Sequence, residues 1–351
     1  MERQAEGCSE VVKVQNIYYM LAYAFSVLNE QGFKNLGAEE FGNTAELFAA
    51  ILARGISSQI KRGLGREYLP DTEALSTLRG KIDVSASVKT RSVLRRQMVC
   101  TYDDFSVNSC MNRVIKSVAV MLMKADISRS RKKELRGLLQ FFSGVELVNL
   151  RTVDWNFRYN RNNQTYRMML AVCYLTVNGL LQTQSDGTMR MMDFLDERNL
   201  PGLYEKFILE YFRKEFPQLR PSSPHVEWQV DDDFRDMLPI MRTDVTLTHG
   251  DKMLIIDAKC YSHATAMNFG TRKFHSGNLY QIFTYVKNAA LSAASHEVSG
   301  MLLYAKTDEE GISPHEYSMS GSRISVRTLD LSGDFEMIRE QLNDIAEKLL
   351  C

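Results

Sequence analysis

The N-terminal half of the chain shows helical hydrophobic periodicity, interrupted by one stretch with the two-residue period of a strand. Apolar residues recur at helical spacing in five segments, which predict helices over residues 16–28, 46–62, 112–124, 128–145 and 166–181. Between the second and third segments, residues 78–88 alternate apolar and polar side chains, and residues 95–106 are also extended in character. The pattern therefore predicts an α+β region with a small β-rich insert.

The pattern breaks at residues 182–202, where turn-forming residues replace sustained apolar runs. After the break it predicts, in order, a helix, strands, a second helix, one strand and a terminal helix over residues 335–350. We place a domain boundary in the break, which gives an N-terminal α+β domain over residues 1–190 and a second domain over residues 191–351. The predicted fold class is mixed α/β.

Two strand-like runs in residues 238–261 flank a short loop and carry the candidate chemistry. A Gly-Asp pair at residues 250–251 suits a two-residue hairpin turn, because glycine readily takes a positive φ. Counting outward from that turn places Asp244 directly opposite Asp257. Lys259 shares their face, because side chains two residues apart on a strand point the same way.

Two carboxylates that face each other across paired strands repel and destabilise the sheet, so this arrangement calls for a cation. Mg²⁺ suits the arrangement, since one or two carboxylates hold it and it keeps waters that phosphate oxygens can replace. Lys259 would then orient or help to deprotonate an attacking water, or stabilise charge that builds on a phosphate. The alternative is a surface hairpin whose Asp and Lys side chains are only solvated.

Two further positions bear on this choice. Glu205 falls in the apolar arc of the helix at residues 202–216, where a carboxylate is costly unless it is paired or bound to a metal. It is either a third acidic group of the metal site or an edge position that reaches water. Gln281 and Tyr285 are four residues apart and share a helix face. They either cap the core or contact the site, as in the QxxxY motif of nucleases related to RecB, which they resemble.

Composition narrows the class of protein. The chain has 351 residues, enough for two domains, and Lys+Arg and Asp+Glu both number 43, so its formal net charge is zero. This balance argues against a protein that coats DNA by bulk charge, although local basic patches remain possible. One such run lies at residues 129–133, and it is either a solvated helix face or a phosphate-contacting patch.

Cysteine usage and the missing targeting signals predict a soluble cytoplasmic protein. The six cysteines include no CxxC pair, and Cys260 with His263 makes only a lone C-x-x-H, so free thiols are expected. No signal peptide and no apolar run of membrane-spanning length is found. The GxxxxGK[ST] phosphate loop is absent as well, so the chain is not expected to bind a nucleotide through a P-loop of its own.

Stretches over most of the chain resemble McrC, the nuclease subunit of the McrBC modification-dependent restriction systems and a member of the PD-(D/E)xK superfamily. The matching stretches are NIYYMLAYAF from Asn16, RGKID from Arg79, NRVIKS from Asn112, LPIMRTDVTL from Leu238, LIIDAKCY from Leu254 and GTRKFHSGNLYQIFTYV from Gly270. The motif residues transfer to Asp244, Asp257 and Lys259 without substitution. Glu205 and Gln281 stand where accessory residues are expected.

The resemblance implies a PD-(D/E)xK restriction-endonuclease-like core over residues 191–351, preceded by a domain that binds a partner and stimulates it. McrC proteins work with McrB, an AAA+ protein that forms rings, hydrolyses GTP and recognises methylated cytosine in DNA. The expected activity is a Mg²⁺-dependent DNA endonuclease subunit, with GTP bound by the partner and not by this chain. The expected catalytic residues are Asp244, Asp257, Lys259, Gln281 and Glu205, and the expected metal ligands are Asp244, Asp257 and Glu205.

Two other functions remain open. The first is a non-catalytic regulator of an AAA+ partner that keeps a degenerate nuclease fold, although the intact Asp244, Asp257 and Lys259 set argues against it. The second is a stand-alone nuclease of the RecB-like type, which would cut DNA without a partner.

Overall fold

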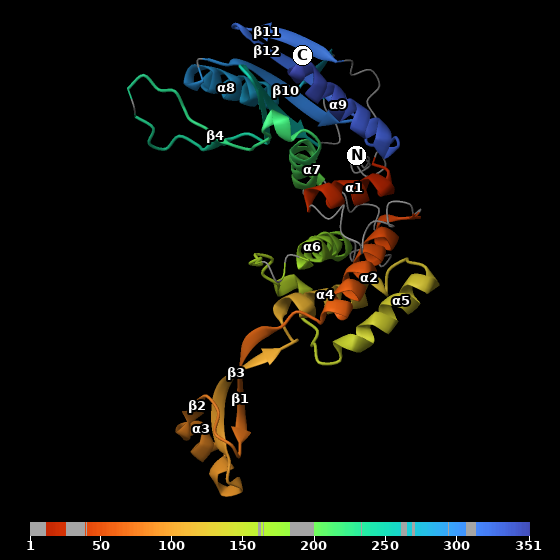
Figure 1. Ribbon diagram of the computed structural model, residues 1–351, viewed down its shortest axis with the longest axis vertical. Helices are drawn as coiled ribbons and strands as arrows, with labels where there is room; N and C mark the ends of the chain where they lie inside the picture. The colour runs from red at the N-terminus through yellow and green to blue at the C-terminus, as the bar shows by residue number, and fades with distance from the viewer. Residues whose placement is uncertain are drawn as a thin grey trace. The chain divides into compact units, whose positions relative to one another are not determined.

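The computed structural model describes residues 12–25, 39, 41–160, 163, 165–182, 200–232, 234–260, 265–268, 271–293, 295–306 and 314–351. The chain divides into two compact units (Figure 1). Unit 1 comprises Met1–Leu47 together with Asn178–Cys351, and unit 2 comprises Phe48–Val177. The boundary after Val177 lies near the predicted break, whose central residues 183–199 fall outside the described chain.

This division differs from the predicted one, because the N-terminal helix belongs with the C-terminal sheet. Helix α1 (Val14–Ala24) packs on α7 (Leu200–Glu215). The Tyr23 hydroxyl of α1 donates a 2.8 Å hydrogen bond to Glu215 Oε1, and its ring packs against that of Tyr211 at a tilt of 44°. Contacts between residues this far apart in sequence leave no signal in local periodicity.

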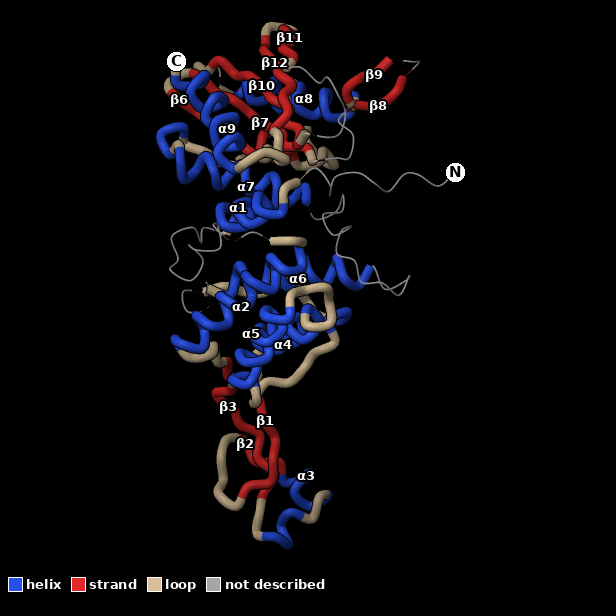
Figure 2. Tube along the Cα trace, turned by 90° about the vertical axis from the view of Figure 1, so that its right-hand side faces the viewer, coloured by secondary structure: helices blue, strands red, loops and turns tan. Residues whose placement is uncertain are grey.

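Unit 1 is built around a five-stranded mixed sheet in the order β11-β12-β10-β7-β6 (Figure 2). The three central strands are parallel, and each edge strand pairs with its neighbour as an antiparallel hairpin. Helix α8 (Ser276–Ser292) lies between β7 and β10 in the chain and forms their crossover connection. The strands are β6 (Val245–His249), β7 (Lys252–Lys259), β10 (Glu297–Ala305), β11 (His315–Met319) and β12 (Ser322–Leu329).

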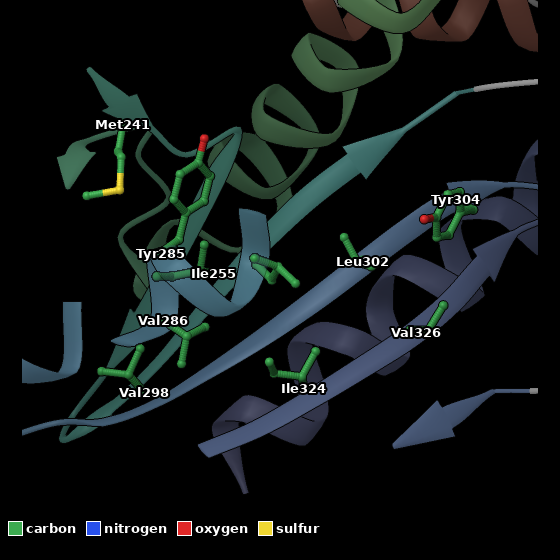
Figure 3. Packing of buried hydrophobic residues seen from close by; sticks show 10 residues of the cluster. Met241, Ile255, Tyr285, Val286, Val298, Leu302, Tyr304, Ile324 and Val326 are labelled. Atoms are coloured by element: carbon green, nitrogen blue, oxygen red, sulfur yellow. The ribbon is translucent and has the colours of Figure 1, made fainter. Parts of the chain in front are cut away.

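Helices cover both faces of this sheet, as the alternation of buried residues requires. On one face, Ile282 and Val286 of α8 join side chains such as Ile255 and Leu302 in a buried cluster (Figure 3). The residues between them on the strands, such as Leu303, are also buried and point to the other face, toward α9 (Phe335–Leu350). The central strands are therefore apolar on both sides.

Gly300 of β10 allows α8 to approach the sheet closely. A Cβ at this position would lie 2.8 Å from Ile282 Cγ1 and 2.8 Å from Val286 Cγ2, which is closer than real side chains pack. Any other residue would have to move the helix or these two side chains. The backbone at Gly300 therefore sets the spacing between α8 and the sheet whose strand β7 carries Asp257 and Lys259.

Two short strand pairs complete unit 1. One pairs β4 (His225–Val226) with β5 (Met241–Arg242), and the other pairs β8 (Thr265–Asn268) with β9 (Thr271–Phe274). A long loop joins β4 to β5, and the indole Nε1 of Trp228 closes it by donating a 2.7 Å hydrogen bond to the Pro239 carbonyl.

Unit 2 consists of a helical part and an antiparallel sheet in the order β1-β3-β2. The Asn112 amide ties the two parts together, because its Nδ2 donates to the carbonyls of Gly65 and Val107 while its Oδ1 accepts from Tyr166. The strands are β1 (Glu67–Leu75), β2 (Lys81–Asp83) and β3 (Met98–Ser106). The helices are α2 (Thr44–Arg62), which begins in unit 1, α3 (Val84–Lys89), α4 (Cys110–Leu122), α5 (Arg129–Leu139) and α6 (Tyr166–Gln182).

Three predicted elements were wrong in part. Residues 78–88 form the short strand β2 and then α3, because the Asp83 side chain caps the helix by accepting from Ala86 N at 2.8 Å. The helix predicted over residues 128–145 stops at Leu139 and is followed by a 3₁₀ turn. Three strands, and not one, precede α9, since Ser320 and Gly321 both take positive φ in a tight turn between β11 and β12.

The sequence predicted free thiols and no membrane-spanning segment, and both predictions can be compared with the described residues. Five cysteines lie within it, and all five are free thiols, as expected; Cys8 and His263 lie outside it. No helix in the described ranges is long and apolar enough to cross a membrane.

Candidate active site

The hairpin β6–β7 has the predicted register. His249 pairs with Lys252, the intervening Gly250 has φ +59°, and the ladder runs on to Val245 opposite Ile256. The next position outward places Asp244, which precedes β6, opposite Asp257 in β7. Their carboxyl groups interact directly, and each affects the pKa of the other.

Asp257 is a buried carboxylate without the hydrogen bonds that usually accompany burial. The residue is 1% exposed, and neither Oδ1 nor Oδ2 accepts a well-directed hydrogen bond from a described residue. Lys259 Nζ lies 2.9 Å from Oδ2 and forms an ion pair with it. Burial raises the pKa of Asp257 to about 6, against the attraction of Lys259 and together with the repulsion of Asp244. The charged carboxylate is therefore unfavourable here unless a further cation is present.

Asp244 is the better satisfied member of the carboxylate pair. Its Oδ2 accepts a 2.8 Å hydrogen bond from the backbone N–H of Ala258. Burial raises the pKa of Asp244, although this hydrogen bond and the positive charges of Lys259 and Arg242 act in the opposite direction. The Ala258 amide thus fixes one oxygen of Asp244 beside Asp257.

Lys259 links the carboxylates to helix α8. Its Nζ donates a 3.3 Å hydrogen bond to Gln281 Oε1, and Gln281 Nε2 in turn donates a 2.8 Å hydrogen bond to the Tyr285 hydroxyl. The predicted common face of Gln281 and Tyr285 is confirmed. In the structure the face meets the lysine of the site, so Gln281 orients the ammonium group and Tyr285 orients Gln281.

Glu205 of α7 contributes to the electrostatics of the same site. Burial raises the pKa of Glu205 to about 7, with further contributions from Asp244 and Asp257 that raise it and from Lys259 that lowers it. The structure thus brings all five predicted residues together. It does not close them into a metal cage, since no group of three or more His, Cys, Asp or Glu residues in the described chain is placed to hold a metal ion.

The residues present fit a hard divalent cation. Both oxygens of Asp257 are buried, Lys259 Nζ pairs with Oδ2, and Asp244 adds a second carboxylate next to them. Mg²⁺ needs only one or two carboxylates, because it retains water in the remaining positions. Asp244 and Asp257 are therefore the residues that would hold such an ion, and Glu205 lies near enough for their charges to raise its pKa.

Sequence reasoning missed the residues that surround the Asp244–Asp257 pair and hold it in place. The Ala258 N–H that fixes Asp244 left no sequence signal, because any residue but proline supplies one. Arg242 stands two residues before Asp244, which is a signal that spacing on a strand could have given. Asn278 of α8, which donates a 2.9 Å hydrogen bond to the buried Tyr304 hydroxyl, holds the start of the helix next to the strand that follows it.

Unit 1 is thus a mixed α/β domain with an Asp-Asp-Lys group at one end of the β6–β7 hairpin. The family model for McrBC 5-methylcytosine restriction system components matches residues 4–305. The chain belongs to this family.

Two individual proteins illustrate the likeness. The type IV methyl-directed restriction enzyme EcoKMcrBC of Escherichia coli (strain K12) is 30% identical over 346 residues, which cover 97% of this chain and 99% of the relative. A solved half-complex from a tetradecameric assembly of Thermococcus gammatolerans McrB AAA+ hexamers with bound McrC has a TM-score of 0.51 and 18% identity, covering 95% of this chain and 76% of that chain. At this identity the second match supports the fold alone.

Proposed function

We propose that the chain is the Mg²⁺-dependent DNA endonuclease subunit of a methylcytosine-dependent restriction complex, with a restriction-endonuclease-like PD-(D/E)xK core in unit 1. The observation that carries the proposal is Asp257. A carboxylate that is 1% exposed, faces another carboxylate and has its pKa raised to about 6 despite an ion pair with Lys259 is expensive to keep for stability alone. A divalent cation held by the pair would offset this cost.

Each residue then has a role in phosphodiester hydrolysis. When bound, Mg²⁺ lowers the pKa of its water and polarises a phosphate oxygen. Asp244 and Asp257 would hold the ion, with Asp244 kept in place by the Ala258 amide. Lys259 carries its charge to the reacting phosphate and is held in position by Gln281 and Tyr285. Glu205, whose pKa is raised to about 7, is suited to accept a proton from a water near the pair.

The partner in this proposal is a ring-forming AAA+ GTPase of the McrB kind, which binds the GTP, and the substrate is DNA that carries modified cytosine. The solved half-complex named above has McrC bound to McrB hexamers. Unit 2 offers a docking surface in the β1–β2 loop, helix α3 and the 3₁₀ turn Ser92–Arg95, because apolar side chains are unusually exposed there. They include Leu78 (58% exposed), Val84 (60%), Val88 (65%) and Leu94 (82%).

Replacing Asp257 by Ala tests the proposal. DNA cleavage by the chain together with its GTPase partner should fall by at least about a thousandfold, since the loss of a metal ligand removes several kcal/mol of transition-state stabilisation. Stimulation of the partner's GTPase should survive. The control is Asp251→Ala, an exposed aspartate in the turn of the same hairpin, which should leave both activities unchanged.

The same assay separates the two other candidate functions. If the wild-type complex stimulates GTPase activity but never cuts DNA in Mg²⁺, the chain is a regulator with a degenerate site. If the purified chain cuts DNA robustly without the partner, it is a stand-alone nuclease. Cleavage that persists in Asp257→Ala would show that the assigned site is wrong. A comparison of methylated with unmethylated DNA tests the substrate.

A further inference from the structure

Arg242 is an arginine of unit 1 that stands beside the carboxylate pair and has no carboxylate partner in the described chain. It is exposed, whereas the preceding Met241 is buried in the core under α8, so the two side chains of β5 point in opposite directions. Its only hydrogen bond to a described side chain or backbone group runs from Nε to Ser223 Oγ, at 3.1 Å. Neither terminal Nη group has an acceptor among the residues that the structure describes.

Other arginines of unit 1 are used differently. Each of five arginines makes an ion pair with a carboxylate at 2.7 to 3.1 Å, which neutralises its charge on the protein itself. These are Arg213, Arg235, Arg323, Arg327 and Arg339. Arg242 lies two residues from Asp244, the obvious carboxylate to pair with, and makes no ion pair with it. Its charge is therefore not neutralised by an ion pair within the described chain and acts beside Asp244.

Ser223 holds Arg242 in a defined direction. The Ser223 hydroxyl donates a 2.6 Å hydrogen bond to the Thr243 carbonyl, so the lone pairs of its oxygen are free to accept from Arg242 Nε. The serine backbone is fixed on both sides: Ser222 exchanges two backbone hydrogen bonds with Thr246, and Pro224 accepts one from Thr243. A guanidinium fixed through Nε presents its two Nη groups as a planar fork, the geometry that suits two oxygens of one phosphate.

We propose that Arg242 binds a DNA backbone phosphate beside the Asp244–Asp257 pair, and that Ser223 is the positioning residue that aims it. The inference rests on the proposed function, because it takes the phosphodiester as the ligand. It adds to it a substrate-binding group opposite in sign to the carboxylates. Asp244 and Asp257 repel the DNA backbone, and Arg242 attracts it even when no metal ion is bound.

Direct DNA binding by the full-length chain tests the inference without requiring cleavage. Fluorescence anisotropy of a short labelled DNA duplex is measured with Ca²⁺ in place of Mg²⁺, over a range of salt concentrations, for the wild type, Arg242→Ala, Arg242→Lys and Ser223→Ala. The matched control is Arg323→Ala, an exposed arginine at the other end of the same sheet, where it pairs with Glu297. Thermal unfolding midpoints verify that every variant is folded.

Arg242→Ala should weaken binding about tenfold, the loss typical of one charge-assisted contact, and the slope of log K against log salt should become shallower by about one. Arg242→Lys should keep the slope but lose part of the affinity, because an ammonium cannot form the fork. Ser223→Ala should weaken binding by about twofold to fivefold with the slope unchanged. Arg323→Ala should match the wild type.

Three results would overturn the inference: a wild-type chain that does not bind the duplex, an Arg242→Ala isotherm and salt slope equal to those of the wild type, or an equal loss in Arg323→Ala. Cleavage with partner and Mg²⁺ is measured in parallel on the wild type. Absence of cleavage with normal Arg242-dependent binding would contradict the proposed function and leave the phosphate contact standing. Normal cleavage together with DNA binding that does not depend on Arg242 would support the proposed function and contradict the phosphate contact.

Discussion

Two lysine–aspartate pairs lie at the same end of the central sheet, yet they differ in almost every physical respect. Lys259 and Asp257 come from the end of β7 and are 2.9 Å apart, with side chains 12% and 1% exposed. Lys306 and Asp330 directly follow β10 and β12 and are 2.6 Å apart, with side chains 48% and 26% exposed. A list of ion pairs would treat them as equals.

Their surroundings set them apart. Asp330 is partly buried, which raises its pKa, but Lys306 and the hydroxyl and backbone N–H of Ser332 more than compensate, so the pKa ends below its usual value. Asp257 has the ion pair with Lys259 but accepts no hydrogen bond from a described backbone N–H or serine hydroxyl, and its pKa rises to about 6. The Lys306–Asp330 pair has its charges and hydrogen bonds satisfied by the protein itself. The Lys259–Asp257 pair keeps a buried carboxylate with a raised pKa, which is the condition that a bound cation would relieve.

The largest expected effect comes from removing the two lysines in turn. Lys259→Gln should reduce cleavage by the assembled complex about a hundredfold to a thousandfold, because it removes a fixed charge at the reacting phosphate. Lys306→Gln removes an exposed pair worth less than about 1 kcal/mol and should cut DNA at the wild-type rate. Single-turnover cleavage measures both. Equal losses in the two variants would mean that Lys259 is as structural as Lys306.

An intermediate effect is expected on stability and its pH dependence. In EDTA at pH 8, Asp257→Asn should raise the free energy of unfolding by about 1 to 3 kcal/mol, since asparagine resembles the neutral acid that the buried site favours. Asp330→Asn should lower it by less than about 1 kcal/mol. Urea unfolding in EDTA and in Mg²⁺ measures both, and Mg²⁺ should stabilise the wild type but not Asp257→Asn.

The sign follows from proton linkage. The pKa of Asp257 is raised on folding, so the folded state binds the extra proton and its relative stability is lost as the pH rises from about 4, the ordinary aspartate value, through about 6. The gain from Asp257→Asn should therefore vanish below pH 4. Asp330 has a lowered pKa, so its contribution should instead disappear as the solution becomes acidic. An Asp257→Asn variant that is less stable than the wild type at pH 8 in EDTA would contradict the contrast.

The smallest effect is expected at the far end of the hydrogen-bond chain behind Lys259. Tyr285→Phe removes the hydroxyl that accepts from Gln281, so the turnover rate should fall about threefold to tenfold while substrate binding stays unchanged. Tyr280→Phe on the same helix is the control, because that side chain is 69% exposed. Steady-state cleavage separates rate from binding. A loss of similar size in Tyr280→Phe would contradict the role of the Tyr285 hydroxyl in orienting Gln281.

The site was more predictable than the division of the chain. A Gly-Asp turn and the two-residue period of strands are local signals, and together they placed Asp244 opposite Asp257 and Lys259 on the same face. The apolar arc of its helix likewise placed Glu205 toward the interior, where it is half-buried beside the carboxylates. These predictions needed only neighbours in sequence.

The features that were missed depend on contacts between distant segments. Tyr23 is hydrogen-bonded to Glu215, 192 residues away, and nothing in the pattern around either residue indicates that α1 joins the unit that carries the site. The strand pair β11–β12 was missed for a different reason: its Ser-Gly turn was not read as a turn signal. Family resemblance identified the class of protein but could not supply these contacts.

Gly300 has a consequence for how this site tolerates change. It lies on β10, one strand away from Asp257, and touches none of the five site residues, yet the absence of its side chain fixes how far Gln281 stands from Lys259. The activity of such a protein is therefore exposed to substitutions in its framework that leave every functional group intact. A Gly300→Ala variant would keep every side chain of the site. Its added methyl group would nevertheless push α8, and with it Gln281, away from Lys259.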